Sequence, residues 1–203
     1  MGMETAKKGG ALGRPRSFDP DQALESALGV FRQKGYEGTS LTDLTEAMGI
    51  NRPSLYAAFG NKEELFRKAL ARYSKDAASG AMCALNGPTA RFAAEGLLNA
   101  AVTAADCTQH RGCLTVVGAL SCSEEGATIQ QELCAQRMAT QDALRERFLK
   151  GQADGDLSAD ADADALARFI ATVHFGLSVQ AASGATPEDL RKVVDTALQA
   201  WPE

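Results

Sequence analysis

The chain has 203 residues, a formal net charge of −5 and 45% hydrophobic residues. This length is enough for one large or two small domains with a buried core, and the apolar content excludes an intrinsically disordered chain. No uninterrupted apolar run approaches the roughly 18 residues of a membrane span, and no apolar segment of a signal peptide follows Lys7 and Lys8. Five cysteines without an export signal indicate reduced thiols. We therefore expect a soluble, cytoplasmic, globular protein with no membrane segment.

The charge is distributed unevenly along the chain. Residues 1–75 hold 12 Lys and Arg against 9 Asp and Glu, a net +3, whereas residues 76–203 hold 9 against 17, a net −8. The basic excess lies at the extreme N-terminus, in Lys7, Lys8, Arg14 and Arg16. Residues 1–17 are rich in Gly and Pro, so we expect a flexible arm there. A basic arm is one means by which a protein binds polyanions, although a solubilising tail has the same composition.

Helix signals recur along the chain, while strand signals are nearly absent. Asp19-Pro20-Asp21-Gln22 is typical of a helix start, and Lys34-Gly35 of a helix end. Ser40 to Asp43 forms a second capping box, and the helix that it starts ends at Gly49. Asn51 then caps a helix to about Phe59, and Asn61 caps a longer one. These signals predict three short helices followed by a longer one.

Beyond residue 80 the predicted helices lengthen. One spans Ile129 to Phe148, a small acidic connector follows over residues 151–164, and two apolar helices close the chain. We therefore predict an all-α fold with a basic arm (1–17), a three-helix DNA-binding module (18–75) and a helical effector-binding and dimerisation domain (76–203).

The short helices on either side of Gly49-Ile50, preceded by a third, indicate a helix-turn-helix at residues 40–59. In that motif the second helix lies in the DNA major groove, and its first residues contact base edges. The residues at those positions are Asn51, Arg52, Ser54 and Leu55. Tyr56 and Lys62 carry groups suited to phosphate. The alternative is a plain three-helix bundle with Tyr56 and Phe59 in its core.

The segment from Ser40 to Phe66 resembles the DNA-binding segment of the TetR/AcrR family of bacterial transcriptional repressors. Its most specific part is Leu-Tyr-x-x-Phe-x-x-Lys-x-x-Leu at residues 55–65, and the segments 35–40 and 13–16 also match. The resemblance implies a homodimeric repressor that reads a palindromic operator in double-stranded DNA, without a cofactor and without enzymatic activity.

The resemblance also implies a role for each matching position. Four residues would contact the DNA backbone: Thr39, Ser40, Tyr56 and Lys62. Four would face bases: Asn51, Arg52, Ser54 and Leu55. Arg14 and Arg16 would enter the adjacent minor groove.

The second half of the chain is expected to bind an effector, a small molecule or a thiol-reactive compound of unknown identity. Four cysteines are concentrated in it: Cys107, Cys113, Cys122 and Cys134. Cys107, His110 and Cys113 have a spacing that suits a soft metal ion. Cys113, beside Arg111, is the strongest thiol candidate, although cysteine is also a common core residue. His174 is either a buried histidine or a polar group of the pocket.

The last two helices carry apolar stripes that fit a four-helix seam with a second copy of the chain. Three small residues would allow close approach: Ala171, Gly176 and Ala181. Packing within one subunit is the competing interpretation. Two other functional classes stay open from the residues alone, namely a cytosolic helical thiol or metal enzyme and a protein-interaction module.

Overall fold

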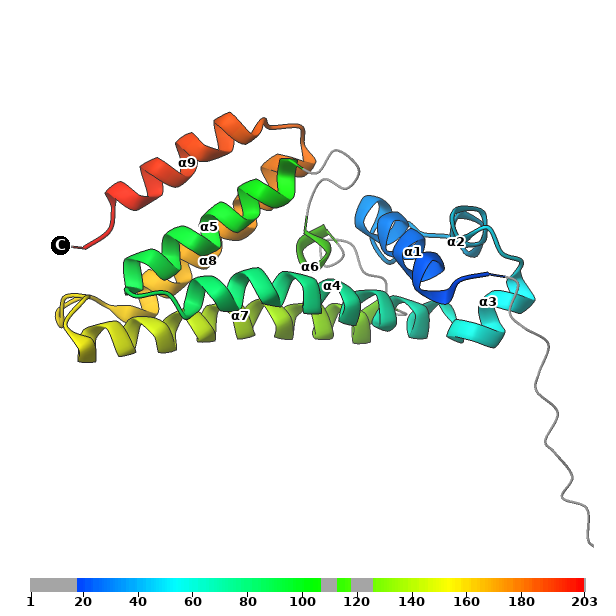
Figure 1. The fold of residues 1–203 in the computed structure, drawn as a ribbon, viewed down its shortest axis with the longest axis horizontal. Coiled ribbons are helices and arrows are strands. Elements are labelled where there is room, and N and C mark those ends of the chain that lie inside the picture. The colour runs from blue at the N-terminus through cyan, green and yellow to red at the C-terminus, as the bar shows by residue number, and fades with distance from the viewer. Residues whose placement is uncertain (1–17, 107–112, 118–125, 203) are drawn as a thin grey trace, which may run out of the picture.

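The computed structural model describes the backbone of residues 18–106, 113–117 and 126–202, and the side chains of all of these except 76–82, 105, 106 and 117. In that part of the chain the regular elements are α-helices (Figure 1), which confirms the predicted all-α class. Their bounds are α1 (Pro20–Lys34), α2 (Leu41–Met48), α3 (Arg52–Phe59), α4 (Lys62–Leu85), α5 (Ala90–Asp106), α6 (Leu114–Val117), α7 (Ala127–Asp154), α8 (Ala163–Ala182) and α9 (Pro187–Gln199).

The predicted helix starts are confirmed by their hydrogen bonds. The carboxylate of Asp19 accepts from the backbone N–H groups of Asp21 and Gln22, and Ser40 and Asp43 form a reciprocal capping box. Asn51 accepts from the backbone N–H of Ser54 at 2.9 Å. Gly49 adopts a left-handed conformation with φ 64°, which lets α3 begin after only three intervening residues.

The buried side chains form two clusters, and the first is the core of the N-terminal head, which comprises α1 to α3 and the start of α4. Residues from α1 to α4 meet there, among them Phe31, Leu44 and Phe66. Leu114 from α6 and the α7 residues Ile129 and Leu133 are buried in the same cluster. The head therefore shares its core with α6 and with the first turns of α7. The predicted domain boundary at residues 75 and 76 lies inside the continuous helix α4.

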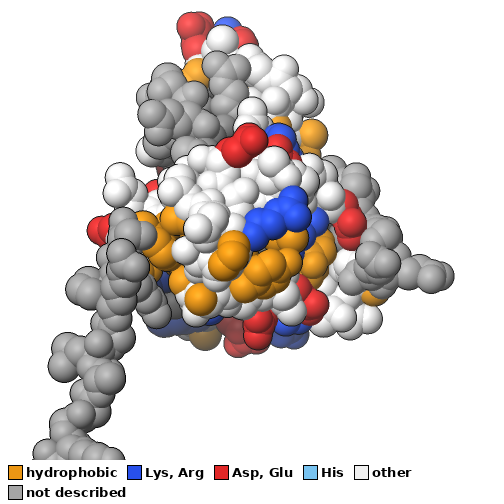
Figure 2. All heavy atoms as spheres, turned by 90° about the vertical axis from the view of Figure 1, so that its right-hand side faces the viewer, with side chains coloured by type: hydrophobic (Ala, Val, Ile, Leu, Met, Phe, Trp, Pro, Cys, Tyr) orange, Lys and Arg blue, Asp and Glu red, His pale blue; other side chains and the backbone are white. Residues whose placement is uncertain are grey.

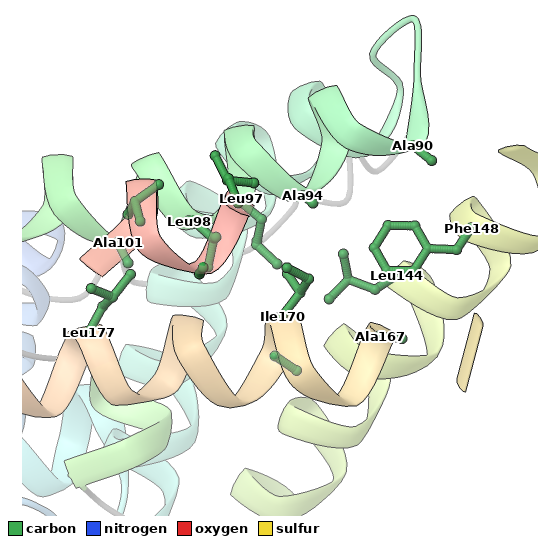
Figure 3. Close-up of a cluster of buried hydrophobic side chains, with 14 of the residues drawn as sticks. Ala90, Ala94, Leu97, Leu98, Ala101, Leu144, Phe148, Ala167, Ile170 and Leu177 are labelled. Atoms are coloured by element: carbon green, nitrogen blue, oxygen red, sulfur yellow. The ribbon is translucent and has the colours of Figure 1, made fainter. Parts of the chain in front are cut away.

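The second cluster is the core of the C-terminal body, in which α5 packs between α8 and α9 and also contacts α7. Figure 3 shows Leu97 and Leu98 of α5 facing Ile170 of α8, with Phe148 of α7 at one end. Trp201 closes this core with its ring edge-on to Phe148, at 5.4 Å between ring centroids. This body carries α8 and α9, the helices expected to form the dimer.

Helix α8 packs in the core on one side and exposes apolar groups on the other. It is long and apolar enough to cross a bilayer by length and composition alone, but Ile170 and Leu177 are buried in the body core. Ala171 and Ala181 are also buried within the subunit, so the expectation that these two residues line the dimer seam is corrected. Gly176 is exposed, and a Cβ added there would meet no atom within 4 Å.

Helix α7 is longer than predicted: it continues to Asp154, into the expected acidic connector. Within that connector, Asp156 makes contacts with the protein instead of being exposed to solvent alone. Its Oδ2 lies 3.6 Å from Nη2 of the buried Arg147, and its Oδ1 accepts from the backbone N–H of Ala90 at 2.7 Å. Arg147 also donates to the carbonyl of Gly87 at 3.2 Å. Asp156 therefore ties the end of α7 to the start of α5.

This arrangement predicts that Asp156→Ala lowers the free energy of unfolding by about 3 kcal/mol, because it leaves a buried guanidinium without its carboxylate. Urea denaturation followed by circular dichroism measures the change. Asp160→Ala is the matched control, since Asp160 is exposed in the same connector, and it is expected to change stability by less than about 0.5 kcal/mol. Equal effects of the two substitutions would show that the buried pair does not stabilise the body.

Candidate nucleic-acid interface

Helix α3 has one face in the core of the head and one face in solvent. Leu55 and Phe59 are buried, whereas Arg52, Pro53 and Tyr56 are exposed, as the 3.6-residue helical period requires. Figure 2 views the molecule from the end that carries α3 and shows apolar side chains beside Lys and Arg side chains there. The outer face of α3 is therefore an available surface of mixed apolar and basic character.

The first residues of α3 present polar groups at the surface. The side-chain oxygen of Asn51 is used in capping, so its amide nitrogen is left to donate. The Nη2 atom of Arg52 donates to Oγ1 of Thr42 on α2 at 3.1 Å. Ser54 is only half-buried. Asn51, Arg52 and Ser54 therefore lie where the helix-turn-helix hypothesis places base contacts.

Tyr56 is 49% exposed, while Phe59 is buried against the core. The three-helix-bundle alternative placed both rings in the core, and the structure places only Phe59 there. Because the Tyr56 ring lies at the surface, its hydroxyl is available to a phosphate oxygen.

Two predicted contact residues are not on this surface. Leu55 is 0% exposed, because its position on α3 is opposite the outer face, so the expectation that it faces bases is corrected. Thr39 is 1% exposed, and its hydroxyl donates to the carbonyl of Gly35 at 2.6 Å. In this structure Thr39 holds the turn between α1 and α2, and its hydroxyl does not reach solvent.

The two remaining candidates for backbone contacts also have structural roles. The Ser40 hydroxyl is exposed and donates to Asp43 Oδ2 at 2.7 Å. Lys34 donates to the other oxygen of Asp43 at 2.6 Å and, with Ser40, holds the pKa of that carboxyl well below its usual range. Lys62 is half-buried with its Nζ 4.5 Å above the Tyr36 ring, and burial lowers its pKa. Arg14 and Arg16 lie outside the described residues.

The thiol candidates that the structure describes lie between the head and the body. Cys113 is half-buried just before α6, and its Sγ accepts from the Tyr73 hydroxyl at 3.2 Å. The same sulfur lies 2.9 Å from Oγ1 of Thr115. Burial, together with Cys113, raises the pKa of Tyr73, so its hydroxyl stays protonated and able to donate.

A second thiol is linked to this group through Arg137. Arg137 donates to Sγ of Cys134 at 3.0 Å and also to the carbonyl of Thr115. These contacts form one hydrogen-bonded cluster of five residues: Tyr73, Cys113, Thr115, Cys134 and Arg137. Sequence reasoning missed Tyr73, because its contact with Cys113 joins residues 40 positions apart. It also missed Arg137, although the spacing of three residues between Cys134 and Arg137 on α7 could have indicated their contact.

The other effector candidates do not join this cluster. His174 lies on α8, where its Nδ1 is 3.1 Å from the Leu97 carbonyl and burial lowers its pKa. Cys107, His110 and Cys122 lie outside the described residues, so the proposed metal spacing has no described geometry. Among the residues that the structure describes, no three His, Cys, Asp or Glu side chains gather as a metal site.

Comparison with known proteins connects this geometry to a family. Residues 23–69 match the model of bacterial regulatory proteins of the tetR family. The HTH-type transcriptional repressor ComR of Escherichia coli K12 is 34% identical over 200 residues, which cover 94% of this chain and 92% of that protein. BdcR, another HTH-type transcriptional repressor of that strain, is 48% identical over 71 residues, which cover 35% of this chain and 36% of that protein.

Solved structures agree over nearly the whole chain. A cysteine mutant of the TetR family regulator CifR, complexed with 26-bp double-strand operator DNA, is 48% identical with a TM-score of 0.90, covering 94% of this chain and 100% of that one. A TetR regulator from Rhodococcus sp. RHA1 is 42% identical with a TM-score of 0.63, covering 91% of this chain and 100% of that one. The chain therefore belongs to the TetR family of bacterial transcriptional regulators.

Proposed function

We propose that this protein is a homodimeric transcriptional repressor that inserts α3 of each subunit into the major groove of a palindromic operator. The observation that carries the proposal is the position of α3, whose inner face is fixed in the head core while Arg52 and Tyr56 remain exposed. Similarity to CifR, which was solved with its operator DNA, supports this mode of binding. The family consists of DNA-binding regulators, so the comparisons give no support to an enzyme.

Dimerisation through α8 and α9 accounts for apolar side chains that a single subunit leaves exposed. Phe169 and Val179 of α8 and Val193 of α9 are between 38% and 45% exposed. On α8 they lie on the same side as Gly176, where open space would let a second backbone approach. We expect a second copy of the chain to cover this face, because the two-fold symmetry of a homodimer matches that of a palindromic operator.

Release from DNA requires an effector that binds the two dimer conformations unequally, with a coupling of about 1–3 kcal/mol. We propose that a thiol-reactive effector acts at Cys113. The neighbouring residue, Leu114, is fully buried in the core of the head, so a group added to the Cys113 sulfur would act on the contact between head and body. The hydrogen bond from Tyr73 on α4 would be lost in the same step.

The first prediction from the proposed function concerns phosphate contact. Tyr56→Phe removes one surface hydroxyl and is expected to weaken DNA binding by about 1 kcal/mol, or roughly fivefold, on every sequence alike. Fluorescence anisotropy measures the affinity for DNA from the region upstream of the protein's own gene and the affinity for unrelated DNA. Thermal unfolding checks that the head is intact. A change restricted to the upstream sequence would contradict a phosphate role.

The second prediction concerns the dimer. Val179→Glu places a charge on the exposed apolar face of α8 and is expected to give monomers in light scattering after size exclusion, with loss of operator binding. Met138→Glu is the matched control, because Met138 is 66% exposed on α7 and lies outside this face. If the Val179 variant stays dimeric, the seam lies elsewhere.

The third prediction concerns the thiol. N-ethylmaleimide adds the Cys113 thiol across its carbon–carbon double bond: the S–H bond and the π bond break, a C–S bond forms, and the adjacent carbon takes up a proton. This treatment is expected to release wild-type protein from DNA. Cys113→Ser should remain bound, while Cys83→Ser, which removes an exposed thiol, should be released like wild type. Release of the Cys113 variant would remove this residue as the sensor.

A further inference from the structure

We propose that Thr42 and Arg52 form one reading unit, in which Arg52 recognises a guanine in each operator half-site and Thr42 is the residue that positions it. The inference rests on the proposed function, since it requires α3 in the major groove. It goes further by naming the base that the helix selects and by assigning a role to Thr42, a residue of α2 that sequence analysis did not single out.

The pair joins the two helices of the motif at their N-terminal ends. Arg52 is the first residue of α3, and Thr42 is the second residue of α2. Both are exposed, and Arg52 Nη2 donates to Thr42 Oγ1 at 3.1 Å. No acidic side chain forms an ion pair with Arg52 within the described part of the chain. The guanidinium is thus held by a neutral hydroxyl, and its charge is not neutralised.

The composition of α3 leaves the reading of a base largely to this side chain. Arg52 is the one charged residue in α3, whose sequence is Arg-Pro-Ser-Leu-Tyr-Ala-Ala-Phe. Of the other exposed residues of α3, Pro53 and Ala57 have no side-chain hydrogen-bonding group, and Tyr56 has a single hydroxyl. Arg52 is therefore the group on this face that can recognise a base edge with two hydrogen bonds at once.

The chemistry of the guanidinium selects guanine. It carries five N–H donors in a fixed planar arrangement, and Thr42 uses only one of them. The major-groove edge of guanine offers two acceptors, O6 and N7, whose spacing fits two parallel N–H groups. An exposed arginine without an anchor samples many rotamers, so the bond to Thr42 orders the side chain before DNA binds. Thr42 does not need to touch the base to affect its selection.

The test begins with duplexes that the wild-type protein selects from a random library, in which a guanine is expected in each half-site. Each guanine is then replaced by 7-deazaguanine, which lacks the N7 acceptor, or by inosine, which keeps O6 and N7 and lacks only the minor-groove amino group. We expect one position per half-site at which 7-deazaguanine weakens wild-type binding about tenfold and inosine does not.

The variants separate reading from positioning. Arg52→Ala should bind the normal and 7-deazaguanine duplexes equally. Thr42→Val should lose most of the same discrimination while keeping the wild-type dependence on salt, because the number of phosphate contacts is unchanged. Thr42→Ser keeps the hydroxyl and should restore the discrimination.

The possible failures are distinguishable. If the wild type retards no DNA, the proposed function falls and this inference falls with it. If the wild type binds a selected duplex but tolerates 7-deazaguanine at every position, guanine reading alone is overturned. If Thr42→Val discriminates as well as wild type, Arg52 reads without assistance and the role of Thr42 is overturned.

Discussion

The burial of Leu55 and Phe59 is the interaction that sets how the protein presents α3 to DNA. Both side chains of α3 enter the head core beside Phe31 and Phe66. Because a helix repeats every 3.6 residues, fixing this inner face turns Arg52 and Tyr56 outward. The hydrophobic effect therefore does more than stabilise a small bundle, since it sets the direction in which α3 presents its polar residues.

The same core connects the reading surface to the rest of the molecule. Leu114, Ile129 and Leu133 are buried with the head residues although they belong to α6 and α7. Hydrogen bonds also connect α4 to α7: Arg67 donates to Glu132 at 2.8 Å, and Ser74 donates to Gln136 at 3.1 Å. The head therefore cannot tilt against the body without breaking these contacts. Such a connection between the two parts is the physical requirement for an effector to control DNA binding.

Local features of the structure could be predicted from the sequence, whereas long-range contacts could not. The capping box at Ser40, the cap at Asn61 and the helix end at Gly49 depend only on neighbouring residues, and the structure confirms each of these predictions. Leu55 was predicted to contact bases from its position in the helix-turn-helix motif alone. The helical period, which places Leu55 on the buried side of α3, was not taken into account. The contact between Tyr73 and Cys113 spans 40 residues, and no local pattern encodes it.

The central claim is that the outer face of α3 lies in the major groove in two symmetric copies. A photo-crosslinking benzoyl-phenylalanine placed at Ala57, with Met138 as the control position, tests it on selected operator DNA. We predict that Ala57 cross-links to two symmetry-related sets of bases, one helical turn or a multiple of it apart, and that Met138 gives none. Cross-linking of Met138 but not of Ala57 would place another face of the protein on DNA and would contradict the insertion of α3 into the major groove.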